Sequence, residues 1–204
     1  MDPRAHWETI YTTKDIHDVS WFQSEARRSL DLIASICPDK SAPIIDVGGG
    51  GSVLVDDLLA AGYRDVTVLD VSEAALDISR DRLGADSARV NWLCADVLAS
   101  RLPDNAYAVW HDRAVFHFFN TAAERQMYVA QVRRAVRPGG HVLVATFADD
   151  GPQSCSGLPV TRYSAPGLHS EFGDEFQLIG SDHEDHQTPG GARQSFLYCL
   201  CRTE

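Results

Sequence analysis

The stretch Pro43-Ile-Ile-Asp46-Val-Gly48-Gly49-Gly50-Gly51-Ser52 decides the fold prediction. It joins a short apolar run, typical of a buried strand, to a run of glycines. A helical pattern follows over residues 53–61, and Gly62 stands where it would end that helix. Glycines directly after a strand let the backbone turn sharply and approach a ligand that any Cβ would exclude. The stretch therefore predicts a strand, a ligand-binding loop and a helix in succession.

Two common nucleotide-binding loops do not fit this pattern. A P-loop needs a lysine followed by Ser or Thr after its glycines, and Ser52-Val53-Leu54 contains no lysine. The dinucleotide fingerprint Gly-x-Gly-x-x-Gly fails in both registers, because Val53 or Leu54 stands at the third glycine position. Asp46, two residues before the first glycine, would repel a pyrophosphate but suits a cofactor with an amino group. The loop therefore favours S-adenosylmethionine over NAD.

From about residue 42 onward, short apolar segments alternate with helical ones, which indicates a parallel sheet covered on both faces. Further strands are expected at 65–70, 89–95, 106–111 and 141–147, with helices at 72–83 and 121–136. Two more strands, 176–181 and 195–201, follow a short helix at 165–172. They have no long helix between them, which predicts an antiparallel end to the sheet. The fold class is therefore a doubly wound, Rossmann-like α/β sheet.

We expect one domain over residues 1–204. Residues 1–40 are expected to form a helical lid, with the best helix at 24–36, and residues 41–148 the cofactor-binding core. Residues 149–204 are expected to hold a substrate loop, rich in Gly, Pro and Ser over 149–162, and the closing strands.

Two further acids follow predicted strands. Asp70 ends the second strand about twenty residues after the glycines, where a carboxylate accepts hydrogen bonds from both ribose hydroxyls of an adenosine. Asp96 follows the third strand and can accept from the adenine amino group, while Val71 and Val97 sandwich the ring. Alternatively, Asp70 is a helix cap or a solvated strand end, and Asp96 belongs to a surface turn.

These motifs together resemble the class I S-adenosylmethionine-dependent methyltransferases. Over about residues 40–148 the order is Asp46-x-Gly48-x-Gly50, Asp70, Ala95-Asp96, His111-Asp112-Arg113 and Arg137-Pro-Gly-Gly140. The resemblance implies a seven-stranded sheet with its last strand antiparallel, and S-adenosylmethionine as methyl donor. It also implies a cofactor site formed by Asp46, Gly48, Gly49, Gly50, Asp70, Val71, Ala95, Asp96, Val97 and His111. Ser52 departs from the family, in which a third glycine is common at this position.

The end of the predicted fourth strand carries the candidate catalytic groups. Its carboxyl end faces the same crevice as the cofactor loops, so His111, Asp112 and His117 are candidate proton acceptors. Asp112 alternatively orients the methionine end of the cofactor or braces Arg113. His117 stands among phenylalanines, where a buried histidine with a packing role is an equal reading.

Aromatic residues near the N-terminus are candidates for a roof over the reacting sulfonium. Trp7-x-x-x-Tyr11 and Ser20-Trp21-Phe22-Gln23 loosely resemble the cover segment of small-molecule methyltransferases of the thiopurine and tellurite type. A cation over an aromatic face gains about 0.5–2 kcal/mol, and such a roof also excludes water. Alternatively, these rings only anchor the N-terminal segment to the core.

Further charged residues are candidates for contacts with a substrate or a metal. Arg113 and Arg162 are further candidate substrate-binding residues, the latter for an acidic substrate. Residues 182–186 contain acids and histidines but are expected to form a solvated loop, so no metal site is predicted.

The composition restricts the partners. With 29 acidic against 18 basic residues the net charge is −11, which argues against DNA or RNA because nucleic-acid binding requires clustered Lys and Arg. The longest apolar runs have the length of strands, so neither a membrane span nor a secretory signal is expected. Five scattered cysteines without a Cys-x-x-Cys pair indicate a reducing, cytoplasmic location.

The sequence therefore predicts methyl transfer from S-adenosylmethionine to the sulfur, nitrogen or oxygen of a small molecule. A protein lysine methyltransferase is the alternative enzyme, and a non-catalytic cofactor-binding module is the alternative from another class. The oligomeric state is left open.

Overall fold

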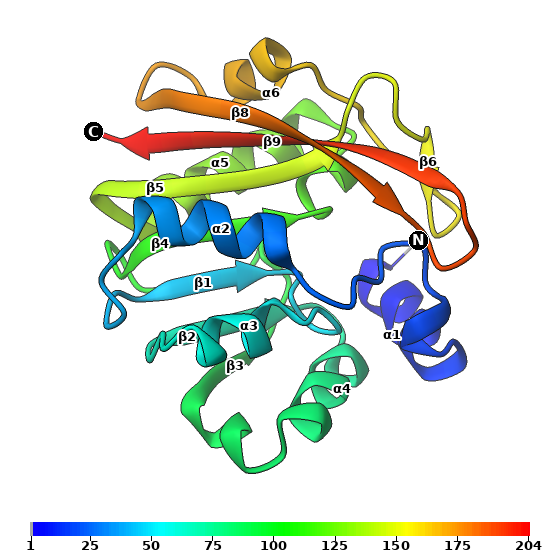
Figure 1. Ribbon diagram of the computed structural model, residues 1–204. Coiled ribbons are helices and arrows are strands. Elements are labelled where there is room, and N and C mark those ends of the chain that lie inside the picture. Colours follow the sequence, from blue (N-terminus) through cyan, green and yellow to red (C-terminus); the bar gives the residue numbers. More distant parts are fainter. Residues whose placement is uncertain (1) are drawn as a thin grey trace.

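Seven strands form one mixed sheet in the order β3-β2-β1-β4-β5-β9-β8 in the computed structural model, which describes residues 2–204 (Figure 1). The strands are β1 (Ile44–Val47), β2 (Val66–Asp70), β3 (Val90–Cys94), β4 (Tyr107–Arg113), β5 (Val136–Phe147), β8 (Phe176–Gln187) and β9 (Arg193–Thr203). Strands β1 to β5 are parallel, whereas β9 runs antiparallel to both β5 and β8. The expected Rossmann-like sheet with an antiparallel last strand is confirmed.

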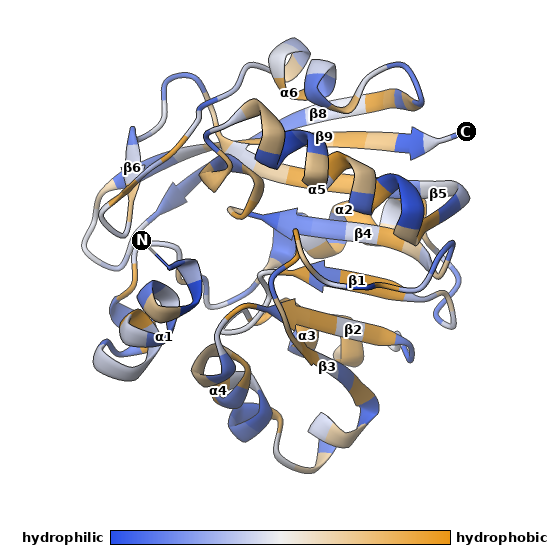
Figure 2. Ribbon diagram, turned by 180° about the vertical axis from the view of Figure 1, so that it is seen from behind, coloured by the Kyte–Doolittle hydropathy of each residue, from blue (hydrophilic) through white to orange (hydrophobic). Residues whose placement is uncertain are grey.

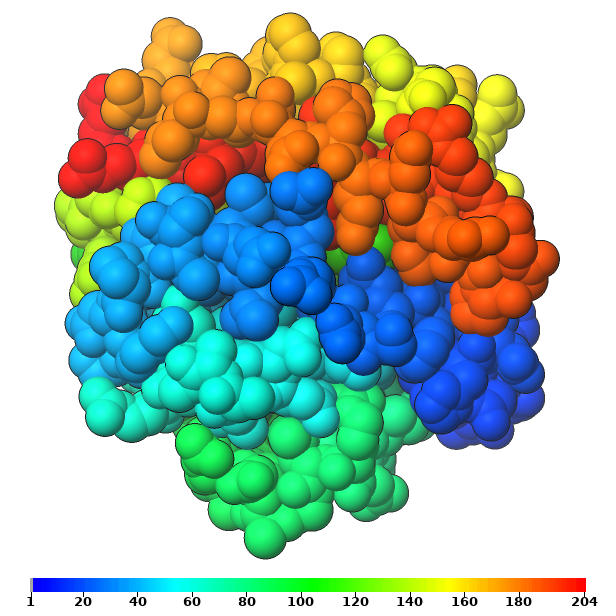
Figure 3. Space-filling model, viewed as in Figure 1, coloured from blue at the N-terminus to red at the C-terminus, as the bar shows by residue number. Residues whose placement is uncertain are grey.

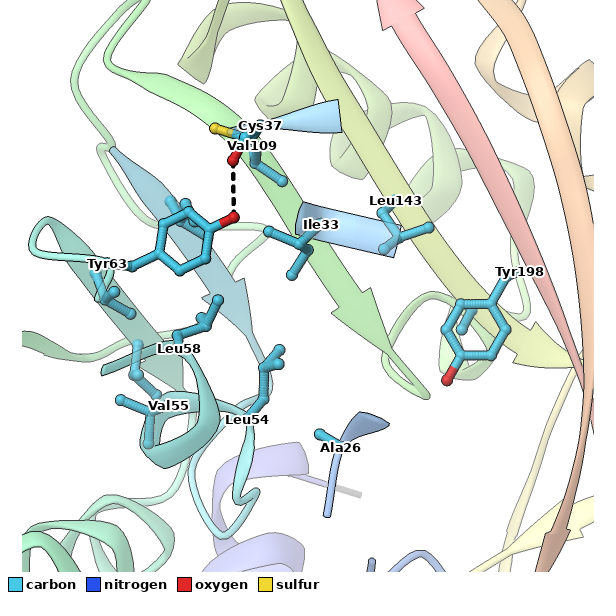
Figure 4. Close-up of a cluster of buried hydrophobic side chains, with 14 of the residues drawn as sticks. Ala26, Ile33, Cys37, Leu54, Val55, Leu58, Tyr63, Val109, Leu143 and Tyr198 are labelled. Carbon is cyan, nitrogen blue, oxygen red and sulfur yellow. Dashed lines mark hydrogen bonds between the residues drawn. The ribbon is translucent and has the colours of Figure 1, made fainter. Parts of the chain in front are cut away.

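Helices cover both faces of this sheet. On one face lie α2 (Arg27–Ile36), α3 (Leu54–Ala60) and α4 (Glu73–Leu83), and on the other lie α5 (Ala122–Ala135) and α6 (Ala165–Phe172). Figure 4 shows part of the core on the α2 and α3 side, where the Tyr63 hydroxyl donates to the Cys37 carbonyl at 2.7 Å. In Figure 2 the strand β2 has hydrophobic colours, whereas the tip of β4 has hydrophilic ones. Polar residues therefore lie at this edge of the sheet.

The helix boundaries follow local sequence signals. Ser72 caps α4 by accepting from the Ala75 N–H at 3.1 Å, because its hydroxyl replaces a missing carbonyl at the helix start. Thr121 and Glu124 form the expected capping box of α5. Gly84 ends α4 with a positive φ of 55°.

The N-terminal segment forms a lid of several short pieces. It comprises α1 (Pro3–Thr13), the single turn η1 (Ile16–Asp18) and α2, which begins at Arg27 rather than at residue 24. In Figure 3 this dark-blue segment lies against the orange and red C-terminal strands. The contact includes the His186 ring, whose Nε2 donates to the Ser20 carbonyl at 2.9 Å.

The expectation of a solvated loop over residues 182–186 is wrong. These residues belong to β8, where Glu184 pairs with Phe196 and His186 with Gln194. Strand β8 is the edge of the sheet and bonds to β9 through its backbone, so polar side chains on it are compatible with strand structure. Strand β8 is therefore longer than expected, and β9 is longer because it pairs with β8 from Arg193 to Thr203.

Two smaller differences concern neighbouring segments. Strand β5 starts at Val136, before the Pro138-Gly139-Gly140 turn, because Val136 already pairs with Tyr107 across a register shift. The Gly- and Pro-rich loop contains a small hairpin of β6 (Ser154–Cys155) and β7 (Leu158–Pro159). Within residues 2–204 no helix is long and apolar enough to cross a membrane.

Candidate cofactor and substrate site

Two adjoining cavities lie at the carboxyl ends of β1, β2 and β4. The larger measures about 280 Å³ and the smaller about 40 Å³. Four residues line both cavities: Tyr11, Trp21, Gly48 and Arg113. This is the edge at which open α/β sheets bind ligands, because the loops that follow parallel strands meet there.

The glycine loop between β1 and α3 has no room for side chains. Gly48 has a φ of +71°, a conformation that favours glycine, and a Cβ at this position would collide with Val115. A Cβ on Gly49 would collide with the Asp46 carboxylate, and one on Gly50 would lie 2.7 Å from Asp70 Oδ2. The loop is therefore built around the two acids that flank it.

Asp70 ends β2 on the wall of the larger cavity. Its carboxylate accepts the backbone N–H of Gly50 at 3.0 Å and that of Ser72 at 2.9 Å. Burial raises the pKa of Asp70 to about 6, and these N–H donors partly oppose the rise. The side chain thus has a fixed orientation, with a proton equilibrium close to neutral pH.

Asp46 lies at the end of β1, on the wall of the smaller cavity. Its Oδ1 is 2.7 Å from His111 Nδ1, and His111 Nε2 is 2.9 Å from the hydroxyl oxygen of Ser29. Strand pairing sets this geometry, because Asp46 and His111 are direct neighbours in the β1–β4 register. Asp46 Oδ2 is buried without a hydrogen-bond partner among the described residues.

The third loop closes the far side of the larger cavity. Val71, Ala95, Asp96 and Val97 all lie on its wall. The Asp96 side chain accepts the N–H of Leu98 at 2.9 Å, which fixes the turn after β3 and leaves the carboxylate exposed. All the candidate cofactor residues thus line the two cavities, apart from Gly50, which lies behind Asp70.

Aromatic rings of the lid cover the larger cavity. The Trp7 ring makes edge contacts with Trp21 and Phe118, at centroid distances of 5.7 and 5.2 Å. Tyr11 joins this cluster, and burial raises the pKa of its hydroxyl far above the ordinary value. Phe22 lines only the smaller cavity. Three of the four rings that the sequence suggested, Trp7, Tyr11 and Trp21, therefore contact one another, whereas the Phe22 ring packs on His17.

Arg113 stands between the two cavities and is held on three sides. Its Nε donates to the Tyr198 hydroxyl at 3.1 Å, and its Nη2 lies 3.3 Å from Glu184 Oε2. The guanidinium also stacks on the Phe196 ring, 3.9 Å from its centroid. Glu184 compensates the charge of Arg113, so this side chain has a fixed orientation towards the cavities.

Three other candidates line neither cavity. Asp112 is fully buried and accepts the hydroxyl of Tyr128 at 2.5 Å and the N–H groups of Val115 and Phe116 at 2.8 and 3.0 Å. Burial raises its pKa to about 6. Through these hydrogen bonds Asp112 stabilises the turn after β4.

The remaining two candidates point away from the cavities as well. His117 is fully buried behind the wall, next to the Phe118 and Phe147 rings, and burial lowers its pKa to about 3. Arg162 is exposed and donates to the Gly151 carbonyl at 3.1 Å.

Several residues of these walls were not selected from the sequence. Ser29 and Glu184 contact His111 and Arg113, and the larger cavity is also lined by His6, Asn120, Glu124, Cys155, Leu158 and Pro159. Three of these, Cys155, Leu158 and Pro159, belong to the Gly- and Pro-rich loop. That loop was expected to carry substrate contacts, so composition was the signal that could have identified them.

Residues 44–140 match the protein family described as a methyltransferase domain. A ubiquinone/menaquinone biosynthesis C-methyltransferase from Dinoroseobacter shibae is 29% identical over 116 residues, which are 55% of this chain and 45% of that protein. EEF1A lysine methyltransferase 2 from Danio rerio is 25% identical over 160 residues, which are 72% of this chain and 69% of that protein. The chain thus spans less than half the length of the first relative.

A solved structure shares the fold over almost the whole chain. It is the 1,6-didemethyltoxoflavin-N1-methyltransferase of Burkholderia thailandensis, with 1,6-didemethyltoxoflavin and S-adenosylhomocysteine bound. The TM-score is 0.72 at 18% sequence identity, and the match covers 98% of this chain and 86% of that one.

Proposed function

We propose that the chain, whose residues 44–140 match a methyltransferase domain, transfers a methyl group from S-adenosylmethionine to the sulfur, nitrogen or oxygen of a small molecule. The observation that most supports this proposal is the larger cavity, which joins the cofactor loops to a largely apolar space under the Trp7, Tyr11 and Trp21 rings. Such a space fits a compact acceptor better than an extended chain.

The residues present fit the cofactor. S-adenosylmethionine supplies an activated methyl group on a sulfonium sulfur when it is bound. Asp46 offers an unpartnered oxygen to its amino group, and the glycine loop leaves space that any Cβ would fill. Asp70 would accept hydrogen bonds from the ribose, and Asp96 would accept from adenine held between Val71 and Val97.

Alignment and the exclusion of water are the main tasks of the protein in such a displacement, and together they can lower the barrier by about 7–11 kcal/mol. The aromatic lid and the apolar wall serve both tasks. No carboxylate or histidine is needed at the acceptor if its nucleophilic atom is already deprotonated. A thiolate or an aromatic nitrogen meets that condition more readily than an alcohol does.

A protein lysine methyltransferase is the second candidate. It is favoured by the match to EEF1A lysine methyltransferase 2 over 72% of this chain, and by the net charge of −11, which suits a basic segment.

Two measurements test the proposal. Isothermal titration should give micromolar binding of S-adenosylmethionine and S-adenosylhomocysteine, and none of NAD. Labelled methyl transfer should then be measured with a panel of thiols, heteroaromatic amines and phenols, in parallel with lysine-rich protein substrates. Methylation of the proteins alone would refute the small-molecule assignment. If the protein does not bind S-adenosylmethionine, methyl transfer from this cofactor is refuted.

A further inference from the structure

We propose that Ser29 and His111 are positioning residues that fix the Asp46 carboxylate and thereby select ligands with an ammonium group. This inference rests on the proposed function, since it assigns the Asp46 oxygen to the amino group of the cofactor. The two positioning residues lie behind Asp46: His111 belongs to β4, and Ser29 belongs to α2 in the lid segment.

The three side chains form a buried chain of hydrogen bonds. The contacts are 2.7 Å from Asp46 Oδ1 to His111 Nδ1 and 2.9 Å from His111 Nε2 to Ser29 Oγ. The Asp46 and His111 side chains are each 3% exposed, and Ser29 is 1% exposed. Charge-assisted and shielded hydrogen bonds of this kind hold a carboxylate firmly.

The other oxygen of Asp46 is free. Oδ2 is buried without a partner among the described residues and lies where a Cβ on Gly49 would be. Buried polar oxygens are almost always hydrogen-bonded, so an unpartnered carboxylate oxygen at a cavity indicates a ligand donor. Because Oδ1 is bound to His111, Oδ2 is the oxygen that remains for that donor.

One tautomer of His111 satisfies every contact. If Nδ1 carries the hydrogen, it donates to Asp46, and Nε2 accepts the hydroxyl hydrogen of Ser29. The second partner of an imidazole fixes which nitrogen is protonated. In this arrangement His111 occupies Oδ1 of Asp46 as a donor, and Oδ2 stays free to accept from an incoming ammonium group.

Ser29, His111 and Asp46 also have the order of a nucleophilic serine triad, in which histidine links serine to an acid. The surroundings argue against that use. Ser29 is fully buried within α2, and its hydroxyl bonds to His111 Nε2 at 2.9 Å in the core, so it is not presented to an ester or an amide substrate. The hydroxyl therefore serves the ring rather than a substrate.

A pair of ligands tests the inference. S-adenosylhomocysteine carries the ammonium group, whereas methylthioadenosine has the same nucleoside and lacks the amino acid. In His111→Leu, which cannot donate to Asp46, affinity for S-adenosylhomocysteine should fall about tenfold or more, while that for methylthioadenosine stays within about twofold. His111→Asn, which keeps a donor near the Nδ1 position, should recover most of the loss. Ser29→Ala should show a smaller loss of the same selectivity.

Controls separate the possible outcomes. Thr146→Val removes a buried, unpartnered hydroxyl elsewhere in the sheet and should change neither affinity. Equal weakening of both ligands by His111→Leu and Ser29→Ala, or no weakening, overturns the positioning role. If the wild type binds neither ligand, the proposed function fails instead.

A spectroscopic measurement tests the contact in the wild type. A ¹⁵N–¹H correlation spectrum, with His111 assigned by the loss of its signals in His111→Asn, should show a hydrogen on Nδ1 of His111. A ring with no hydrogen on Nδ1 would overturn the inference.

Discussion

The Glu8 carboxylate of the lid accepts the hydroxyl hydrogen of Ser72, the cap of α4, at 2.8 Å. It also receives the N–H of Ala74 at 3.3 Å, so it lies directly over the first turn of that helix. A helix N-terminus attracts negative charge through its free N–H groups and its dipole. This contact fastens α1 beside Asp70, at the edge of the larger cavity.

Substitution of Glu8 should loosen the lid. In Glu8→Ala we expect faster hydrogen exchange over α1 and cofactor dissociation about fivefold faster, consistent with about 1 kcal/mol for a partly exposed contact of this kind. Stopped-flow displacement of S-adenosylhomocysteine measures the rate. Glu175→Ala, which removes an exposed acid paired with Arg133 far from the lid, is the matched control. Equal dissociation rates in Glu8→Ala and wild type would show that Glu8 does not hold the lid over the cofactor.

The pKa of Asp70 predicts how nucleoside binding depends on pH. Its carboxyl group has a pKa of about 6 because of burial, so the form that accepts from two ribose hydroxyls dominates only above that pH. Affinity for methylthioadenosine should be constant above pH 7 and fall about tenfold per pH unit below 6. Titration calorimetry between pH 5 and 8 measures this. Methylthioadenosine has no ammonium group, so Asp46 does not contribute.

Asp70→Asn is the control for this dependence. It should bind weakly at every pH and show no slope, since the titrating group is gone. Lower pH affects the stability of the fold in the opposite direction from ligand affinity. Between pH 3.8, the ordinary pKa of an aspartic acid side chain, and about pH 6, the folded state binds more protons than the unfolded chain, so acidification across this window stabilises the fold. A slope that persists in Asp70→Asn would assign the pH effect to another group.

Tyr128 is expected to matter for stability and little for binding. Its hydroxyl accepts from Trp110 Nε1 at 2.8 Å and donates to Asp112 at 2.5 Å, all in the core. Tyr128→Phe leaves a buried carboxylate short of a donor and should cost about 1–3 kcal/mol, or a few degrees of Tm. Thermal unfolding with and without S-adenosylhomocysteine measures both effects.

Tyr163→Phe is the matched control, because that hydroxyl is buried without a hydrogen-bond partner in the described residues. It should leave Tm nearly unchanged. A Tyr128→Phe protein that kept its Tm but lost activity would instead place Asp112 in the chemistry.

The fold was predictable from sequence where local signals coincide with burial. The buried strands β1 and β2 appear as short apolar runs, and the Thr121–Glu124 capping box marks the start of α5. Strand β8 lacked such a signal, because an edge strand is held by backbone bonds to β9 and tolerates alternating acids and histidines.

The residues of the site also differ in how well the sequence predicts them. Asp46, Asp70 and the glycines are recognisable because each lies at the end of a strand or directly after it in the chain. Glu184 acts through Arg113, which is 71 residues away, and Ser29 acts through His111, which is 82 residues away. Such partners are fixed by strand order and helix packing, which no local pattern contains.

Gly49→Ala tests whether the glycine loop is shaped around Asp46. Gly49 does not have a positive φ, so alanine can adopt its backbone conformation, and only space forbids the methyl group. That methyl would displace Asp46 Oδ2, and the carboxylate cannot turn away without breaking its bond to His111. We expect S-adenosylhomocysteine affinity to fall about tenfold or more, measured by calorimetry, and Tm to fall by a few degrees because the buried carboxylate is displaced. Gly180→Ala, where a Cβ meets nothing within 4 Å, should bind normally. Normal binding by Gly49→Ala would mean that Asp46 does not contact the ligand.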